Sequence, residues 1–152
     1  MAAAIVLVGL GAVPASAVTQ GEGGLQAQID AALVGHPGGV QISATTISWD
    51  GGAMLLTFPS ATSRAVGACA TGSYCAFSAI NYTGTKLTFT GCSADGTSNS
   101  LSTLGGSVRS VANARTSGTV RAMNGITVFH TLSANTGVSQ NGSALTNLSC
   151  TT

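Results

Sequence analysis

Four cysteines have the clearest chemistry in this sequence: Cys69, Cys75, Cys92 and Cys150. An even number of cysteines forms disulfides when a chain is exported, whereas in a reducing compartment the same residues stay as free structural thiols. Four cysteines allow three pairings. Of these we favour Cys69–Cys75 as a local clip and Cys92–Cys150 as a long closure that ties the C-terminus to the middle of the chain.

The histidines, acidic residues and serines form no recognisable catalytic or metal-binding pattern. His36 stands in a His-Pro-Gly turn, and His130 shares a strand face with Val128 and Leu132, so we interpret them as a loop residue and a packed or edge residue. Their spacing does not match a zinc site. Asp30, His130 and a serine would make a hydrolase triad, but no Gly-x-Ser-x-Gly motif occurs. We therefore predict no catalytic residue, no metal and no cofactor.

Residues 1–17 predict a signal peptide. An apolar run from Ala2 to Val13 ends at Pro14, and Ala15-Ser16-Ala17 supplies the small residues of a cleavage site. The run is shorter than the roughly 20 residues of a membrane-spanning helix. We expect a secreted, extracellular protein with no membrane segment after signal removal.

The composition limits the partners that the surface can attract. Charged residues make up 6% of the chain, with five basic residues against four acidic ones and 21 glycines. Such a chain has no basic patch for phosphates, which excludes nucleic acid as a partner. We expect a monomer with a surface of Thr, Ser, Asn and Gly.

Residues 18–24 read as a linker and residues 25–60 as a helix followed by a β-hairpin. Leu25, Ile29 and Leu33 form one apolar stripe of a short helix that ends near Gly35. Strands are predicted at 40–48 and 53–58, with an Asp-Gly turn between them. We expect Trp49, which precedes this turn, to pack against the helix.

Residues 66–152 read as a disulfide-held β-domain. Short strands alternate with Gly, Asn and Ser turns, which indicates a sandwich or barrel. The predicted strands are 74–79, 86–90, 107–113, 119–123 and 126–132. Asn124-Gly125 is a further tight-turn signal. The fold class that we predict is mainly β.

One stretch resembles the βγ-crystallin Greek-key signature. Phe77 and Tyr82, followed by Gly84, have its spacing of two aromatics and a glycine. The resemblance implies that the aromatics cover a folded hairpin, that Gly84 takes a backbone angle that a Cβ resists, and that Ser110 bonds back to the hairpin. A second, degenerate repeat would use Phe129 and Gly137.

Residues 25–150 resemble small secreted actinobacterial proteins of the Streptomyces metalloproteinase inhibitor family. The Cys69–Cys75 clip, the segment 109–113 and the pair of segments 36–39 and 47–52 carry this resemblance. It implies a βγ-crystallin-like Greek-key sandwich with an N-terminal helix and β-hairpin. It also implies a peptidase inhibitor, not an enzyme, whose partner is an extracellular protease, possible targets being metalloproteases.

The resemblance leaves the inhibitory loop open. Family inhibitors present a disulfide-braced loop in the second half of the domain, and this chain has no cysteine between Ser93 and Ser149, so that loop is unbraced or absent. If it is present, we expect it within Thr116–Gly125, with Arg121, Met123 and Asn124 as its contact residues. The alternative is a crystallin-like structural or envelope-associated protein without a protease target.

Crystallin-like relatives bind calcium through two Asn or Asp residues placed before a Ser/Thr-Ser pair. The matching positions here are Gly105, Gly106, Arg109 and Ser110. Calcium needs several hard oxygen ligands, and Arg109 brings a positive charge to this place. We therefore expect weak calcium binding or none.

Overall fold

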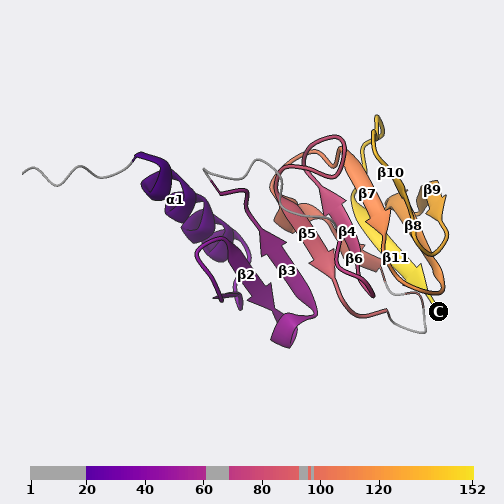
Figure 1. The fold of residues 1–152 in the computed structure, drawn as a ribbon, viewed down its shortest axis with the longest axis horizontal. Coiled ribbons are helices and arrows are strands. Elements are labelled where there is room, and N and C mark those ends of the chain that lie inside the picture. Colours follow the sequence, from indigo (N-terminus) through magenta and orange to yellow (C-terminus); the bar gives the residue numbers. More distant parts are fainter. Residues whose placement is uncertain (1–19, 61–68, 93–95, 97) are drawn as a thin grey trace, which may run out of the picture.

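The computed structural model describes residues 20–60, 69–92, 96 and 98–152 (Figure 1). The signal peptide predicted for residues 1–17 lies outside these residues. The helix α1 spans Gln20–Gly35. The strands are β1 Val40–Gln41, β2 Thr46–Trp49, β3 Met54–Thr57, β4 Tyr74–Phe77, β5 Lys86–Phe89, β6 Ser98–Ser100, β7 Ser110–Asn113, β8 Thr119–Asn124, β9 Thr127–Leu132, β10 Thr136–Val138 and β11 Asn147–Thr151.

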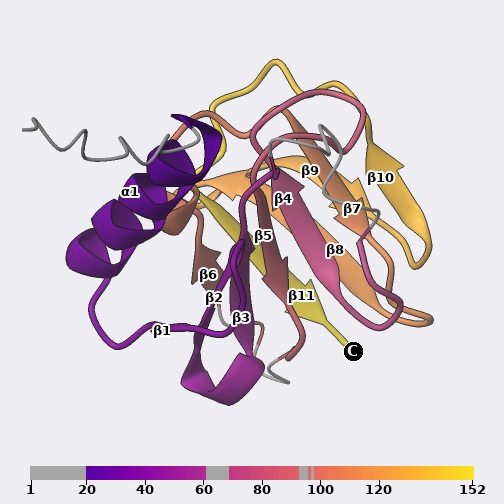
Figure 2. The ribbon, with the colours of Figure 1, turned by 60° about the vertical axis from the view of Figure 1, so that its left-hand side comes forward.

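The strands form two antiparallel sheets, in the orders β1-β2-β3-β5-β4-β7-β10 and β6-β11-β8-β9. The last eight strands fall into two sets of four, β4–β7 and β8–β11. The third strand of each set pairs within the other sheet: β6 lies beside β11, and β10 lies beside β7. This exchange connects the sheets, which face each other as layers in Figure 2. The mainly β class predicted from the sequence is confirmed.

The sequence analysis did not predict three of the strands, β6, β10 and β11. The first two are three residues long and consist of Ser-Asn-Ser and Thr-Gly-Val. Neither sequence favours a strand by itself. They become strands because each pairs with a partner distant in the chain, at Ser98↔Ser149 and Thr136↔Asn113.

The helix begins earlier than predicted. It includes residues 20–24, which read as a linker in the sequence. The predicted apolar stripe is correct, since Ile29 is fully buried and Leu25 and Leu33 are partly buried against the core. The helix ends at Gly35, and Pro37 follows as a stop.

The predicted strand 40–48 is instead two strands, β1 and β2, which pair with each other. The chain reverses between them, with the Ile42 N–H bonded to the Thr46 carbonyl at 2.9 Å. The hairpin of β2 and β3 forms as predicted, with Trp49 opposite Met54. Trp49 is buried, and its indole N–H donates to the His36 carbonyl at 3.0 Å. The ring packs so closely on Gly39 that a Cβ there would lie 2.5 Å from it.

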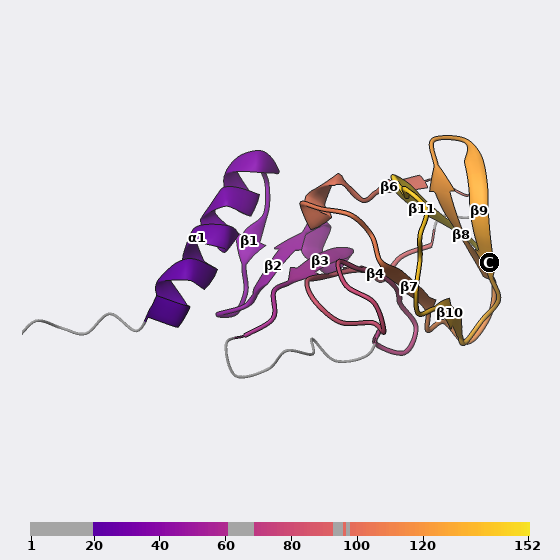
Figure 3. The same ribbon diagram turned by 90° about the horizontal axis from the view of Figure 1, so that it is seen from above.

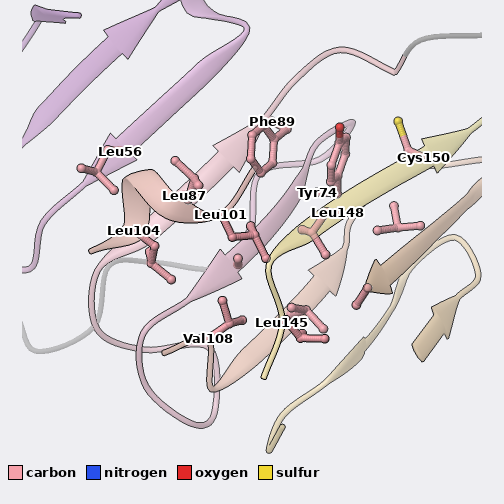
Figure 4. Packing of buried hydrophobic residues seen from close by; sticks show 14 of the residues in the cluster. Leu56, Tyr74, Leu87, Phe89, Leu101, Leu104, Val108, Leu145, Leu148 and Cys150 are labelled. Carbon is pink, nitrogen blue, oxygen red and sulfur yellow. The ribbon is translucent and has the colours of Figure 1, made fainter. Parts of the chain in front are cut away.

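The N-terminal hairpin continues the large sheet of the β-domain. Strand β3 pairs with β5 over four residues, with Leu56 opposite Leu87. Both leucines belong to one buried cluster, part of which Figure 4 shows as far as Cys150 on β11. The same cluster includes Ile29 on α1. The helix, the hairpin and the two sheets therefore share one apolar core.

Two disulfides join Cys69 to Cys75 and Cys92 to Cys150, the pairing that the sequence analysis favours. The first is a local clip that ends on β4. The second joins residues 58 positions apart and attaches the last strand, β11, to the chain after β5. Among the described residues, no helix is long and apolar enough to cross a bilayer.

Candidate functional site

The first hairpin of the β-domain is folded over as the crystallin resemblance implies. The Phe77 and Tyr82 rings meet edge to face at 5.7 Å between centroids. Gly84 has φ +79°, and a Cβ there would lie 2.5 Å from the Ser78 hydroxyl. Ser110, fully buried on β7, accepts from the Tyr82 N–H at 3.0 Å and donates to the Ala79 carbonyl at 2.7 Å. These bonds fasten the hairpin to the sheet.

The segment predicted as an inhibitory loop is mostly a strand. Residues 119–124 form β8, which lies between β9 and β11 in the smaller sheet. Arg121 is exposed on its outer face, Met123 is half-buried beside Asn147 and Ser149, and Asn124 is its exposed last residue. The three residues that we expect to contact a protease therefore lie on a strand, within the range 119–123 predicted for one and at its last residue, because Val120 and Ala122 alternate with them and are fully buried in the core.

The turn that follows β8 is one residue later than predicted. Asn124 pairs with Thr127, which leaves Gly125 and Ile126 as the two turn residues. Gly125 has φ +57°, a value that suits glycine at the first position of a two-residue hairpin turn. The Ile126 side chain is 94% exposed.

A β-bulge follows the turn on β9. Ala122 pairs with His130, but Met123 pairs with Val128, so Phe129 is an extra residue between two pairs. Val128 and Phe129 are therefore both exposed, by 44% and 45%. With Ile126 they are three large apolar side chains exposed within four residues of one hairpin, and we name these three residues the tip patch. It lies on the hairpin that projects from the smaller sheet, at the end opposite α1 (Figure 3).

The tip patch lies in an almost uncharged segment of the sequence. Arg121 is the only Asp, Glu, Lys or Arg from residue 116 to the end of the sequence. A single large apolar side chain in contact with water is common, but exposed apolar patches are typical of binding surfaces, which makes these three residues the candidate site. Hydrophobic contact rather than charge steering would drive association here.

His130 has a structural side-chain contact. His130, on β9 directly after the bulge, lies 3.0 Å through Nε2 from the Asn141 side-chain oxygen. Asn141 is buried, and its amide nitrogen donates to the Val108 and Ser143 carbonyls at 2.9 and 2.7 Å. The contact therefore anchors β9 to the loop before β11.

The second repeat proposed at Phe129 and Gly137 was wrong, because they lie on β9 and β10 rather than around one folded hairpin.

Two groups on the larger sheet, the Tyr74 phenol and the Lys86 ammonium, have shifted pKa values. Burial raises the pKa of the Tyr74 phenol, while the Asn99 hydrogen bond and the charge of Arg115 partly lower it. Burial lowers the pKa of the Lys86 ammonium. Both residues lie on strands of the seven-stranded sheet, so these shifts belong to packing and not to the tip patch.

Two hollows lined by described residues lack the groups of an active site. One, of about 450 Å³, lies between α1 and residues 103–106, and its lining has one histidine and several hydroxyls but no carboxylate. Another, of about 520 Å³, has Arg109 as its only charged lining residue. Within the described ranges, no three His, Cys, Asp or Glu residues lie close enough to hold a metal ion.

One family model matches the middle of the chain. Residues 62–124 match the model of peptidase inhibitor family I36. The I36 match confirms the resemblance to the Streptomyces metalloproteinase inhibitor family. It contains the Cys69–Cys75 clip, the folded hairpin and Ser110, and it ends at Asn124, one residue before the turn. No curated protein and no solved structure matches the chain significantly.

The sequence analysis missed the residues of the tip patch, although it contained a signal for them. Ile126, Val128 and Phe129 lie within four residues directly after an Asn-Gly turn signal. Phe129 is also one of the few aromatic residues, which make up 5% of the chain. We interpreted residues 126–132 as an ordinary strand because alternation alone predicts that every second residue is buried. The bulge, which sequence patterns do not reveal, breaks that alternation.

Proposed function

We propose that this protein is a secreted peptidase inhibitor that binds its target through the tip patch. The observation that supports the proposal is the position of Ile126, Val128 and Phe129 on a two-residue turn and bulge that project from a disulfide-held sandwich. The I36 match supports an inhibitor-type function for the domain that carries the hairpin. A protease is the expected partner, and a metalloprotease is the target class implied by the family resemblance.

A rigid hairpin suits the binding of a protease for a physical reason. Association costs free energy when flexible segments become ordered, so a segment held in one conformation binds more tightly than a free peptide. Extended strands are recognised through their backbone and through pockets for alternate side chains. The apolar side chains of the tip patch would enter apolar pockets of the protease cleft, and Arg121 and Met123 would flank this contact.

The finer architecture that we propose is a βγ-crystallin-like pair of Greek keys. The exchange of β6 and β10 between the sheets supports it. Apart from β1–β3, each sheet then has three strands of one set and one strand of the other. The folded hairpin around Gly84 and Ser110 supports it as well. The disulfides fit the extracellular location that we propose.

The test is a stoichiometric inhibition titration. Oxidised protein is mixed with a thermolysin-like, a subtilisin-like and a trypsin-like protease, and residual activity is measured. We expect inhibition of one class, and we expect it to weaken at least about 100-fold when Ile126, Val128 and Phe129 are all changed to Ser. The matched control changes Val34, Val40 and Ile42 to Ser, since these exposed apolar residues lie on α1 and around β1.

Two outcomes would contradict the proposal. Full inhibition by the tip-patch variant would move the contact elsewhere, and a pair of changes, Arg121→Ala and Met123→Ala, would then test the outer face of β8. A folded wild-type protein that inhibits none of the three proteases would favour the structural, non-inhibitory alternative. The absence of cysteines between Ser93 and Ser149, where family inhibitors have a braced loop, is the observation behind that alternative.

A further inference from the structure

The turn at Gly125 is held by Asn147, the first residue of the last strand, and by Thr146, which precedes it. The Gly125 N–H donates to the Thr146 hydroxyl at 2.9 Å, and the Gly125 carbonyl accepts from the Asn147 side-chain amide at 3.2 Å. The Thr146 hydroxyl donates in turn to the Asn147 side-chain oxygen at 2.8 Å. Every donor meets an acceptor, so Gly125, Thr146 and Asn147 form a closed ring of hydrogen bonds.

The backbone beside this ring makes a further bond. The Thr146 N–H donates to the Met123 carbonyl at 2.8 Å, at the end of β8. Asn147 also donates to the Ser98 hydroxyl on β6. The ring is therefore fixed to strands on both sides of β11, and the turn cannot move without breaking several of these bonds.

The first hairpin of the domain is fastened in a parallel way. There the Arg109 N–H donates to the Phe77 carbonyl at 2.8 Å, and the next residue, Ser110, bonds to the folded hairpin through its hydroxyl. In the second hairpin the Thr146 N–H meets the Met123 carbonyl, and Thr146 and Asn147 bond to the turn. Each hairpin is thus fastened from the start of the fourth strand of its own set.

We propose that Thr146 and Asn147 are positioning residues that brace the tip patch. This inference rests on the proposed function for its effect on binding. The ring holds both backbone groups of Gly125, and Ile126 follows directly. Bracing keeps the turn in one conformation before the protease arrives and so lowers the ordering cost of binding. Neither residue needs to touch the protease.

The experiment compares Thr146→Val with wild type. Valine has nearly the shape of threonine but offers no hydroxyl, so it removes the acceptor of the Gly125 N–H. Two readouts are used. One is hydrogen exchange of the Gly125 amide in the unbound protein, measured by NMR. The other is the inhibition constant against the protease that the titration described above identifies. We expect exchange to become roughly 5-fold faster or more and inhibition about 10-fold weaker.

Three further variants separate bracing from a general loss of stability. Thr146→Ser restores the hydroxyl and should recover both readouts. Asn147→Asp keeps the acceptor of the Thr146 hydroxyl but loses the donor to the Gly125 carbonyl, so it should weaken inhibition as well. Thr136→Val is the matched control, because the Thr136 hydroxyl bonds only to the Ser133 carbonyl, at 2.7 Å, at the start of β10.

The two readouts distinguish the possible failures. Unchanged Gly125 exchange in Thr146→Val would overturn the bracing, whatever the protease assay gives. Faster exchange with unchanged inhibition would overturn the positioning role. If the wild-type protein inhibits no protease, the proposed function fails, while Gly125 exchange still decides whether the ring braces the turn.

Discussion

The phenol oxygen of Tyr74 lies 2.6 Å from the Asn99 side-chain nitrogen, which donates a hydrogen bond to it. Tyr74 is on β4 in the larger sheet and Asn99 is on β6 in the smaller one, so this bond joins the two layers. The Tyr74 ring is buried and stacks on Phe89 with 5.2 Å between centroids. Buried polar groups need such partners, and Asn99 supplies one here.

Tyr74 predicts a pH dependence of stability in the alkaline range. Its pKa in the folded protein is raised above the ordinary value of 10.0, so above that pH the unfolded chain loses the phenol proton first. The unfolded state then binds fewer protons than the folded state, and the free energy of unfolding falls as pH rises. The lowered pKa of Lys86 has the opposite effect and is present in any Tyr74 variant.

Tyr74→Phe isolates the contribution of the phenol. At neutral pH we expect it to lower the free energy of unfolding by about 1 kcal/mol, because the Asn99 amide loses its acceptor. Urea unfolding at about pH 8 and about pH 11 should show the difference from wild type shrinking at the higher pH. An alkaline loss of stability that is equal in both proteins would show that Tyr74 is not its source.

Gly84→Ala should destabilise the folded hairpin more than Gly72→Ala. Both glycines have positive φ, +79° and +87°, so both substitutions strain the backbone. Only at Gly84 would the new Cβ collide, with the Ser78 hydroxyl at 2.5 Å, whereas Gly72 faces open space. We expect losses of about 3 and about 1 kcal/mol in thermal unfolding. Equal losses would mean that Ser78 moves aside without cost.

Ile29→Ala tests whether the N-terminal helix is part of the core. The side chain is fully buried, so its truncation should cost about 2–4 kcal/mol and lower the midpoint of a single unfolding transition. Val34→Ala, on the same helix but 82% exposed, is the control and should change little. A separate early transition, or no change for Ile29→Ala, would mean that α1 is not part of the cooperative unit.

The two disulfides should differ in their contributions to stability. Cys92–Cys150 closes a segment with a sequence separation of 58, whereas Cys69–Cys75 closes one of 6. Loop entropy predicts that double substitution with Ala costs about 4 kcal/mol for the first pair and about 2 kcal/mol for the second. Denaturant unfolding of the two double variants measures this. A larger loss for the short clip would contradict the loop-entropy argument. It would indicate strain at the long bridge in the folded state or residual structure in the unfolded chain.

Calcium should leave the stability of the protein unchanged. Gly105 and Gly106 offer only backbone carbonyls, and the Arg109 guanidinium, which is exposed, repels a cation. Thermal unfolding in about 5 mM calcium and in chelator should therefore give the same midpoint within about 1 °C. A clear rise with calcium, absent with magnesium, would show that ligands outside these positions build a site.

The sequence by itself determined the local features of this protein. The helix stripe at Leu25, Ile29 and Leu33, the hairpin after Trp49 and the folded corner at Gly84 depend on residues close together in the chain. Short-range periodicity and turn chemistry are sufficient for such elements. The resemblance in the cysteine clip and Greek-key signature likewise led to the family, because both are continuous in sequence.

Only the tertiary structure decided the rest, because it depends on pairing between distant segments. Strands β6 and β10 are strands through partners in the opposite set, and the position of β8 between β9 and β11 likewise depends on distant pairing. The exposure of Val128 beside Phe129 follows from a one-residue register shift against β8, which moves Val128 off the inward face. The ring at Gly125 joins residues 21 and 22 positions apart, a contact that neither periodicity nor a motif encodes.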